Sequence, residues 1–132
     1  MGNESEQKLV KVSLENYLKA HETGKSEFIR EAFHKDARIT AVSGGKLLNL
    51  SVNEFACRFN EKPAADEASR KRRIEILDIS GDAAFSKIIL DYPTVKLTDY
   101  ISLLRIDGTW QIVHKSYYAE RKEQKNKIGE GF

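Results

Sequence analysis

From about Arg70 onward, the hydrophobic period of this chain is that of strands, and this change limits its fold more than any single motif does. Before Arg70, most apolar residues recur at three- and four-residue steps, which is the spacing of amphipathic helices, and only residues 37–42 and 46–50 read as short strands. After it, apolar and polar residues alternate, as in half-buried strands. Helices followed by a run of strands predict an α+β domain in which the helices stack on one face of an antiparallel sheet.

Three helices are predicted in the first half of the chain. The first spans about residues 3–23 and ends at Gly24, a common helix stop. A short second helix follows Ser26, and a third begins at Ser51, because Ser51 and Glu54 have the spacing of a capping box. The residues expected on the buried sides of these helices are Val10, Leu14, Tyr17, Leu18 and His21, then Phe28, Ile29, Ala32 and Phe33, then Phe55, Ala56 and Phe59.

The remaining pattern predicts a sheet. Ser80-Gly81-Asp82 and Asp107-Gly108 are typical hairpin turns, since glycine and aspartate tolerate positive φ. Such a sheet curls into a half-open cone, and its concave face must be filled by helices, side chains or a ligand. Residues 1–118 are expected to form one domain, and residues 119–132 a polar C-terminal tail. The predicted strands are about 37–42, 46–50, 72–79, 83–92, 95–107 and 109–118.

Composition excludes several classes of function. The 22 basic and 20 acidic side chains leave a net charge of +2, which argues against nucleic acid or an anionic membrane as a partner. Cys57 is the single cysteine, so no internal disulfide can form, and we expect a cytoplasmic protein with Cys57 as a small buried apolar residue. His21 and His34 lack metal-ligand spacing, and glycine-rich phosphate loops are missing, so neither metal nor cofactor is expected. The basic run 70–73 is expected to be a solvated sheet edge.

Three segments carry a family resemblance: Tyr17–Gly24 followed by Phe33–Ile39, then Leu50–Phe55, then Asp99–Val113. In order and spacing they resemble the nuclear transport factor 2-like superfamily, and within it the polyketide cyclase/ketosteroid isomerase-like and lumazine-binding-like groups. The resemblance implies a cone-shaped α+β barrel with a pocket between helices and sheet, often a dimer through the outer sheet face. Function varies widely in this superfamily, so the fold does not give the activity.

Similarity to the ketosteroid isomerases places their oxyanion-binding tyrosine at Tyr17. Their catalytic aspartate base corresponds to Ala41, and their second, protonated acid falls near Ser102. Alanine cannot remove a proton from a substrate carbon. We therefore expect no ketosteroid isomerase activity.

Tyr17 and His114 are the candidate catalytic residues. Tyr17 could donate a hydrogen bond in a wet pocket or be an ordinary core tyrosine. His114 alternates with Trp110 and Ile112, so its side chain is expected on their face of the sheet, unless a bulge turns it to the other face. There it could be a general base or a structural histidine. We expect Tyr17, Tyr100 and Trp110 to border one cavity. The expected ligand-binding residues are Tyr17, Phe33, Phe55, Phe59, Tyr92, Tyr100, Ser102, Trp110 and His114.

Three functions remain open from the sequence. The first is binding of a small apolar or aromatic molecule, with no assigned reaction. The second is an enzyme of the cyclase, isomerase or dehydratase type that uses Tyr17 and His114. The third is a structural or protein-interaction homodimer, in which the sheet face that carries Ile101 and Leu103 is covered by a second copy.

Overall fold

The computed structural model describes residues 2–123, so residues 124–132 of the predicted tail lie outside the described part. Three helices, a short 3₁₀ turn and six strands follow one another along the chain. In order they are α1 (Gly2–Thr23), α2 (Glu27–Ala32), β1 (Phe33–Ser43), β2 (Lys46–Ser51), α3 (Val52–Ala56), the 3₁₀ turn (Glu67–Ser69), β3 (Lys71–Ser80), β4 (Ala83–Asp91), β5 (Val95–Ile106) and β6 (Thr109–Arg121).

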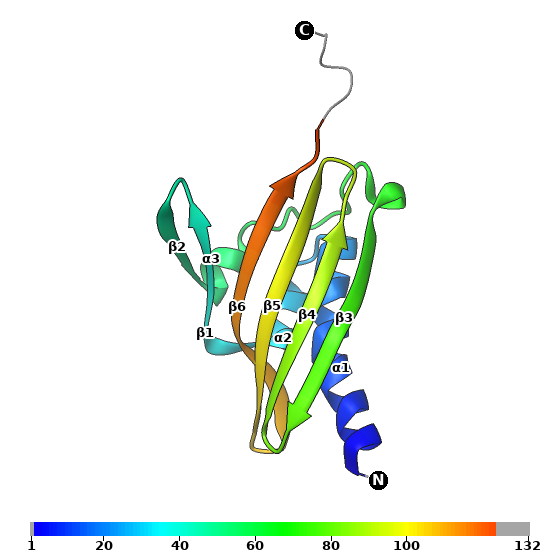
Figure 1. The fold of residues 1–132 in the computed structure, drawn as a ribbon, viewed down its shortest axis with the longest axis vertical. Helices are drawn as coiled ribbons and strands as arrows, with labels where there is room; N and C mark the ends of the chain where they lie inside the picture. Colours follow the sequence, from blue (N-terminus) through cyan, green and yellow to red (C-terminus); the bar gives the residue numbers. More distant parts are fainter. Residues whose placement is uncertain (1, 124–132) are drawn as a thin grey trace, which may run out of the picture.

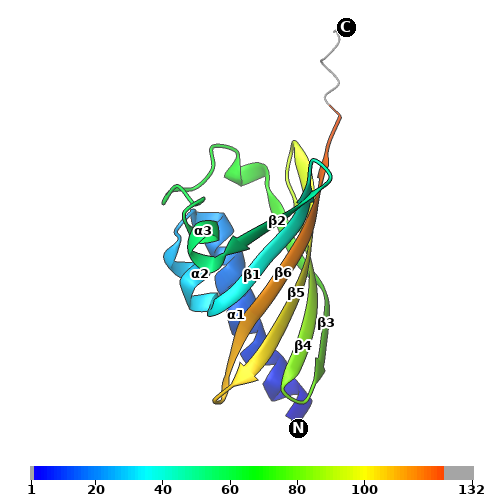
Figure 2. The same cartoon turned by 90° about the vertical axis from the view of Figure 1, so that its left-hand side faces the viewer.

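The strands form one sheet in the order β2-β1-β6-β5-β4-β3 (Figure 1). Neighbouring strands are antiparallel except β1 and β6, which run parallel. The sheet is curved and open at its edges, and α1, α2 and α3 lie on one of its faces (Figure 2). This confirms the predicted α+β class, a half-open and mainly antiparallel sheet with helices packed on it. The parallel β1–β6 pair is a feature that the sequence pattern did not predict.

Helix α1 supplies the longest apolar stripe of the core. Val10, Leu14 and Tyr17 are fully buried against the sheet. The helix ends at Gly24, whose φ is +75°, a conformation that side chains with a Cβ disfavour. The backbone of Glu61 donates to the Gly24 carbonyl, and a Cβ on Gly24 would lie 1.9 Å from the carbonyl oxygen of Lys62. Gly24 therefore lets the loop after α3 pack directly on the end of α1.

The predicted capping box at the start of α3 is confirmed. The Ser51 hydroxyl accepts from the Glu54 amide at 3.1 Å, and the Glu54 carboxylate accepts from the Ser51 amide at 2.9 Å. Both bonds satisfy donors that a helix start leaves without partners. The helix set in this way buries Phe55 and Ala56.

A bulge in β6 decides which side chains of that strand face the helices. Leu103 of β5 pairs with Ile112, but the preceding residue Ser102 pairs with His114, so Val113 is an extra residue in β6. An extra residue reverses the alternation of side chains beyond it. Lys115 is consequently buried, and its neighbour His114 turns to the outer face.

The side chains of β5 point the opposite way from the prediction. Ile101 and Leu103 are fully buried, whereas Tyr100 and Ser102 are exposed on the outer face. Burial of two branched aliphatic side chains is worth more than burial of a tyrosine and a serine in the same positions. The prediction that Tyr100 and Ser102 face the concave side, with Ile101 and Leu103 outward, is therefore wrong.

Replacing Gly24 with alanine tests the contact between α1 and the loop. We expect Gly24→Ala to lower the free energy of unfolding clearly more than Gly81→Ala does, measured by urea denaturation. Gly81 also has positive φ (+57°), but no atom of the described residues lies within 4 Å of a Cβ there. The control should lose about 1–2 kcal/mol from backbone conformation alone. Equal losses in the two variants would contradict the packing described here.

Candidate functional site

Three polar side chains meet in the apolar interior, and we call them the interior triad: Tyr17 of α1, Asp99 of β5 and Lys115 of β6. Tyr17 and Asp99 are fully buried and Lys115 is 3% exposed. The Tyr17 hydroxyl donates to Oδ2 of Asp99, and Lys115 Nζ lies 3.9 Å from Oδ1. Among the described residues, Oδ1 has no hydrogen-bond partner. A buried carboxylate oxygen without a donor is costly, so it marks a place where a ligand atom could bind.

Aromatic rings line the interior around the triad. Lys115 Nζ lies 4.4 Å from the centre of the Phe55 ring and 5.1 Å from that of Tyr17, distances at which ring faces attract a cation. Five aromatic side chains form a closed circuit of ring contacts, with neighbouring centroids 4.8 to 5.9 Å apart: Tyr17, Phe33, Phe55, Phe59 and His21.

Burial shifts the pKa of all three triad members. It raises the pKa of the Tyr17 hydroxyl well above its usual value, and the Asp99 charge adds to that rise. Burial raises the pKa of the Asp99 carboxyl, an effect that the Lys115 charge opposes. Burial lowers the pKa of the Lys115 ammonium, which Asp99 opposes in turn. The pKa values of acid and amine thus approach each other, so moving a proton between them costs less free energy than in water.

His21 is the neutral member of the aromatic circuit. Burial lowers the pKa of its imidazole well below 6.5, and the nearby Lys115 and Arg72 charges lower it further. Although part of the residue reaches the surface, its Nε2 is enclosed and has no hydrogen-bond partner among the described residues. An uncharged His21 therefore packs on Tyr17 at neutral pH without adding a charge to the triad.

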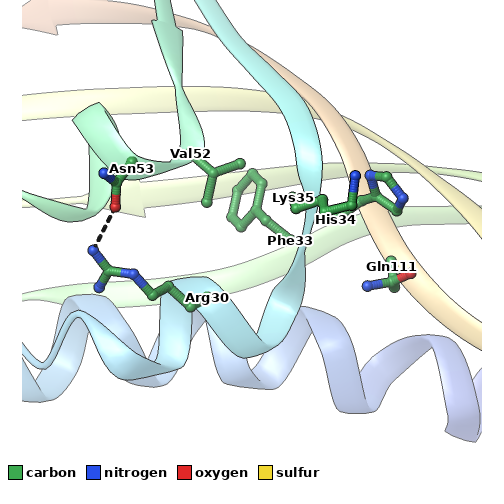
Figure 3. A pocket seen from close by; sticks show the side chains of 7 residues that line it. All are labelled: Arg30, Phe33, His34, Lys35, Val52, Asn53 and Gln111. Carbon is green, nitrogen blue, oxygen red and sulfur yellow. Dashed lines mark hydrogen bonds between the residues drawn. The ribbon is translucent and has the colours of Figure 1, made fainter.

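A pocket of about 560 Å³ opens between α2, α3 and the start of β1 (Figure 3). The Phe33 side chain, which is 2% exposed, is part of its wall, and the Phe33 ring centre is 5.9 Å from that of Tyr17. This volume is typical of small-molecule sites. Phe33 thus stands between the pocket and the interior triad. The residues that line the pocket are Arg30, Phe33, His34, Lys35, Val52, Asn53 and Gln111.

The comparisons with known proteins agree with the fold. Residues 5–118 match the family model described as "Putative lumazine-binding". The chain belongs to this family. An NTF2-like protein of unknown function from Shewanella baltica has a TM-score of 0.82 and 25% identity, over 91% of this chain and 98% of its own. One from Methylobacillus flagellatus has a TM-score of 0.76 and 29% identity, over 88% and 93%. These matches confirm the predicted nuclear transport factor 2-like superfamily.

One curated relative of this lumazine-binding family member is named as an enzyme. The protein "Aldolase FrzH" from Cladobotryum sp. is 26% identical over 105 residues, which is 78% of this chain and 82% of that protein.

The lumazine-binding family member brings four of the predicted ligand residues together inside: Tyr17, Phe33, Phe55 and Phe59. Two others lie inside but serve different contacts. The Trp110 indole donates to Glu6 at 2.8 Å near the start of α1. The Tyr92 hydroxyl accepts from Arg72 at 3.0 Å, beside the 3₁₀ turn.

The other predicted ligand residues lie on the outer sheet face. The Tyr100 ring stacks on Phe85 with centroids 6.3 Å apart, and Ser102 is exposed beside it. His114 Nε2 forms a hydrogen bond of 3.0 Å with the Thr40 hydroxyl. The prediction that Tyr17, Tyr100 and Trp110 border one cavity is therefore wrong. So is the prediction that Tyr17 and His114 act together, because the bulge at Val113 puts them on opposite faces.

The sequence interpretation missed Asp99 and Lys115. Asp99 shares the alternation of Ile101 and Leu103, so the apolar pattern of that strand contained a signal for its burial. The isomerase comparison places an acid near Ser102, whereas the buried acid of this strand is Asp99, three residues earlier. Lys115 gave no such signal, because nothing in the local sequence reveals the bulge before it.

Two smaller predictions also need correction. Cys57 is exposed rather than buried, because it follows the last turn of α3 on the side away from the core. Arg72 belongs to the basic run predicted as a solvated edge, yet its side chain is 10% exposed and lies 2.7 Å from the Glu67 carboxylate. That ion pair ties the 3₁₀ turn to β3.

Within residues 2–123, His, Cys, Asp and Glu side chains form no group of three that could hold a metal ion. The helices of the same region include none that is long and apolar enough to cross a membrane.

A double-mutant cycle tests whether Asp99 and Lys115 interact as a buried pair. We expect Asp99→Asn and Lys115→Met each to lower the free energy of unfolding by about 3–5 kcal/mol, because each leaves a partner buried alone. The double variant should lose at least about 2 kcal/mol less than the sum of the two. Guanidinium denaturation measures all four proteins.

The exposed pair Asp91–Lys122 supplies the matched control. Its cycle with Asp91→Asn and Lys122→Met should give a coupling of about 1 kcal/mol or less. An Asp99–Lys115 coupling no larger than the control's would show that the interior pair is not energetically linked.

Proposed function

We propose that this lumazine-binding family member binds a small carbonyl compound beside the interior triad and removes a proton from the carbon next to the carbonyl. This enolisation is the first step of an aldol reaction. The observation that carries the proposal is the buried Asp99 carboxylate. Its Oδ1 has no hydrogen-bond partner within residues 2–123, and Lys115 Nζ lies 3.9 Å from it.

The triad offers each group that enolisation needs. Burial makes Asp99 a stronger base than an exposed aspartate, and Oδ1 is the oxygen that accepts the substrate proton. As the C–H bond breaks, its electrons form the carbon–carbon double bond of the enolate and the charge moves to the carbonyl oxygen. The Lys115 ammonium stabilises that oxygen, and such stabilisation is strong where water is excluded. Tyr17 holds the carboxylate through Oδ2.

The comparisons support a small-molecule site of this kind. The family description names a small ligand, lumazine, and the relative from Cladobotryum is named an aldolase. The aromatic circuit suits an apolar or aromatic ligand body. We infer that a ligand enters past Phe33, since this ring borders both the pocket and Tyr17.

Exchange of carbon-bound hydrogen in D₂O tests the proposal without knowledge of the natural substrate. The probes are cyclohexanone, acetophenone and pyruvate, and proton NMR follows the loss of their α-hydrogens. We expect exchange that depends on the protein and that falls roughly 100-fold or more in Asp99→Asn, since a positioned base contributes about that much. Lys115→Met should also lose most of the exchange.

The control for this assay is Asp91→Asn, which removes an exposed carboxylate and should leave exchange unchanged. Circular dichroism establishes that each variant is folded. Exchange that proceeds equally in the wild-type protein and in folded Asp99→Asn would rule out Asp99 as the base.

We further propose that two copies associate through the outer sheet face. The helices of residues 2–123 leave this face of the sheet bare (Figure 2). Large apolar side chains from every strand are exposed on it. Monomeric proteins rarely expose large contiguous apolar surfaces, and a two-fold contact between identical faces would cover these side chains. The exposed apolar side chains on this face are Val42, Leu47, Ile76, Phe85, Tyr100, Leu104 and Tyr118.

Light scattering with size-exclusion chromatography measures the assembly. We expect twice the chain mass of 15.0 kDa at micromolar concentration. Tyr100→Asp and Leu104→Asp, which place charge in the middle of the face, should shift the mass to that of one chain. Val12→Asp is the matched control, because Val12 is an exposed apolar residue on α1. A wild-type protein with the mass of a single chain would refute the dimer.

A further inference from the structure

The pocket between α2, α3 and β1 is lined on its polar side by hydrogen-bond donors. Among the residues that the structure describes, its lining contains three basic side chains and two amides but no carboxylate (Figure 3). Its apolar side is Phe33 and Val52, both nearly buried. A pocket with this division fits a ligand that has an apolar body and an acidic group.

The hydrogen bonds already present show which donors remain free. Arg30 Nη2 donates to Oδ1 of Asn53 at 2.8 Å, so the Asn53 amide has its NH₂ group left for a ligand. In the part of the chain that the structure describes, Arg30 has no carboxylate within 4.0 Å. The guanidinium is therefore held in position by neutral partners with its charge uncompensated by an ion pair.

His34 adds a donor of defined orientation. Its Nδ1 accepts from the Asp36 amide at 3.0 Å, so in the neutral ring the proton sits on Nε2. Lys35 stands beside it, exposed and paired with an equally exposed Asp36 at 3.1 Å, a contact that contributes little. Its charge remains effective at the rim of the pocket.

The sheet itself makes room for the pocket. Phe33 pairs with Ile112, and the next paired residue, Arg38, pairs with His114. Between these two pairs β1 advances by five residues and β6 by two. Residues 34–37 therefore separate from β6, and Gln111 of β6 lines the pocket at this irregular stretch. Irregular strand pairing of this kind is common next to functional sites.

We propose that this pocket binds the carboxylate of a small organic acid, with Arg30 as the main anchor and Phe33 and Val52 against the apolar body. The inference deepens the proposed function, because an acid held here would bring the rest of a substrate to Phe33, the ring that contacts Tyr17. Its test measures binding alone, so the acid site and the enolisation can each fail without the other.

Amide NMR titration of the full chain with 1-naphthoate tests the site, and neutral 1-naphthamide is the matched ligand control. We expect naphthoate to shift the amides of residues 30–35 and 52–53. Naphthamide should bind at least roughly tenfold more weakly, since it lacks the charge-assisted bonds. Naphthyl phosphate and inorganic phosphate are included to distinguish a carboxylate site from a general phosphate site.

Variants identify the anchor. Arg30→Gln should weaken naphthoate roughly tenfold or more while leaving naphthamide unchanged, and Arg30→Lys should lose less. Lys46→Gln removes the same charge from the exposed start of β2 and should leave the affinity nearly unchanged. Arg30 is exposed, so its variants should fold, which the dispersion of the amide spectrum establishes.

Four results would overturn the inference. They are equal binding of naphthoate and naphthamide, equal losses in Arg30→Gln and Lys46→Gln, tighter binding of either phosphate than of naphthoate, and no shift of the pocket amides at millimolar naphthoate.

Discussion

The contact on which this structure depends is the burial of Asp99 between Tyr17 and Lys115. It joins α1 to β5 and β6 through polar groups in an otherwise apolar core. A carboxylate in that environment is tolerated only where donors and a positive charge compensate it. The position of α1 on the sheet, the direction in which the β5 side chains point and the bulge in β6 must therefore all agree. The same constraint shifts the pKa values of both groups, because exclusion of water brings those of the acid and the amine closer together.

The bulge at Val113 decides which side chains β6 presents on each of its two faces. On the helix side it delivers Lys115 to Asp99. On the outer side it leaves His114 bonded to Thr40, among the polar residues of a face that is otherwise rich in exposed apolar side chains. One added residue thus separates the interior triad from the proposed dimer surface. Of the two roles that the sequence left open for His114, general base or structural histidine, the hydrogen bond to Thr40 on the neighbouring strand fits the structural one.

The pocket and the interior triad share Phe33. This ring forms part of the pocket wall and also contacts the rings of Tyr17 and Phe55. The two regions differ in chemistry. The pocket presents hydrogen-bond donors to water, whereas the triad places in an apolar interior a carboxylate oxygen that has no partner among residues 2–123. A ligand with an acidic end and a carbonyl end would meet complementary groups in each.

The sequence by itself determined the elements and their order. The change of period at Arg70, the stop at Gly24, the capping box at Ser51 and the hairpin turns are local signals, so helices, strands and the half-open sheet could be predicted from them. The aromatic residues on the helices were also correctly expected inside. Only the tertiary structure decided which face of β5 and β6 is buried. A bulge and a buried charge depend on partners distant in sequence: Asp99 needs Tyr17, 82 residues away. Local patterns predict the burial of apolar residues. They cannot predict the burial of a polar group, because the contacts that offset its desolvation form only on folding.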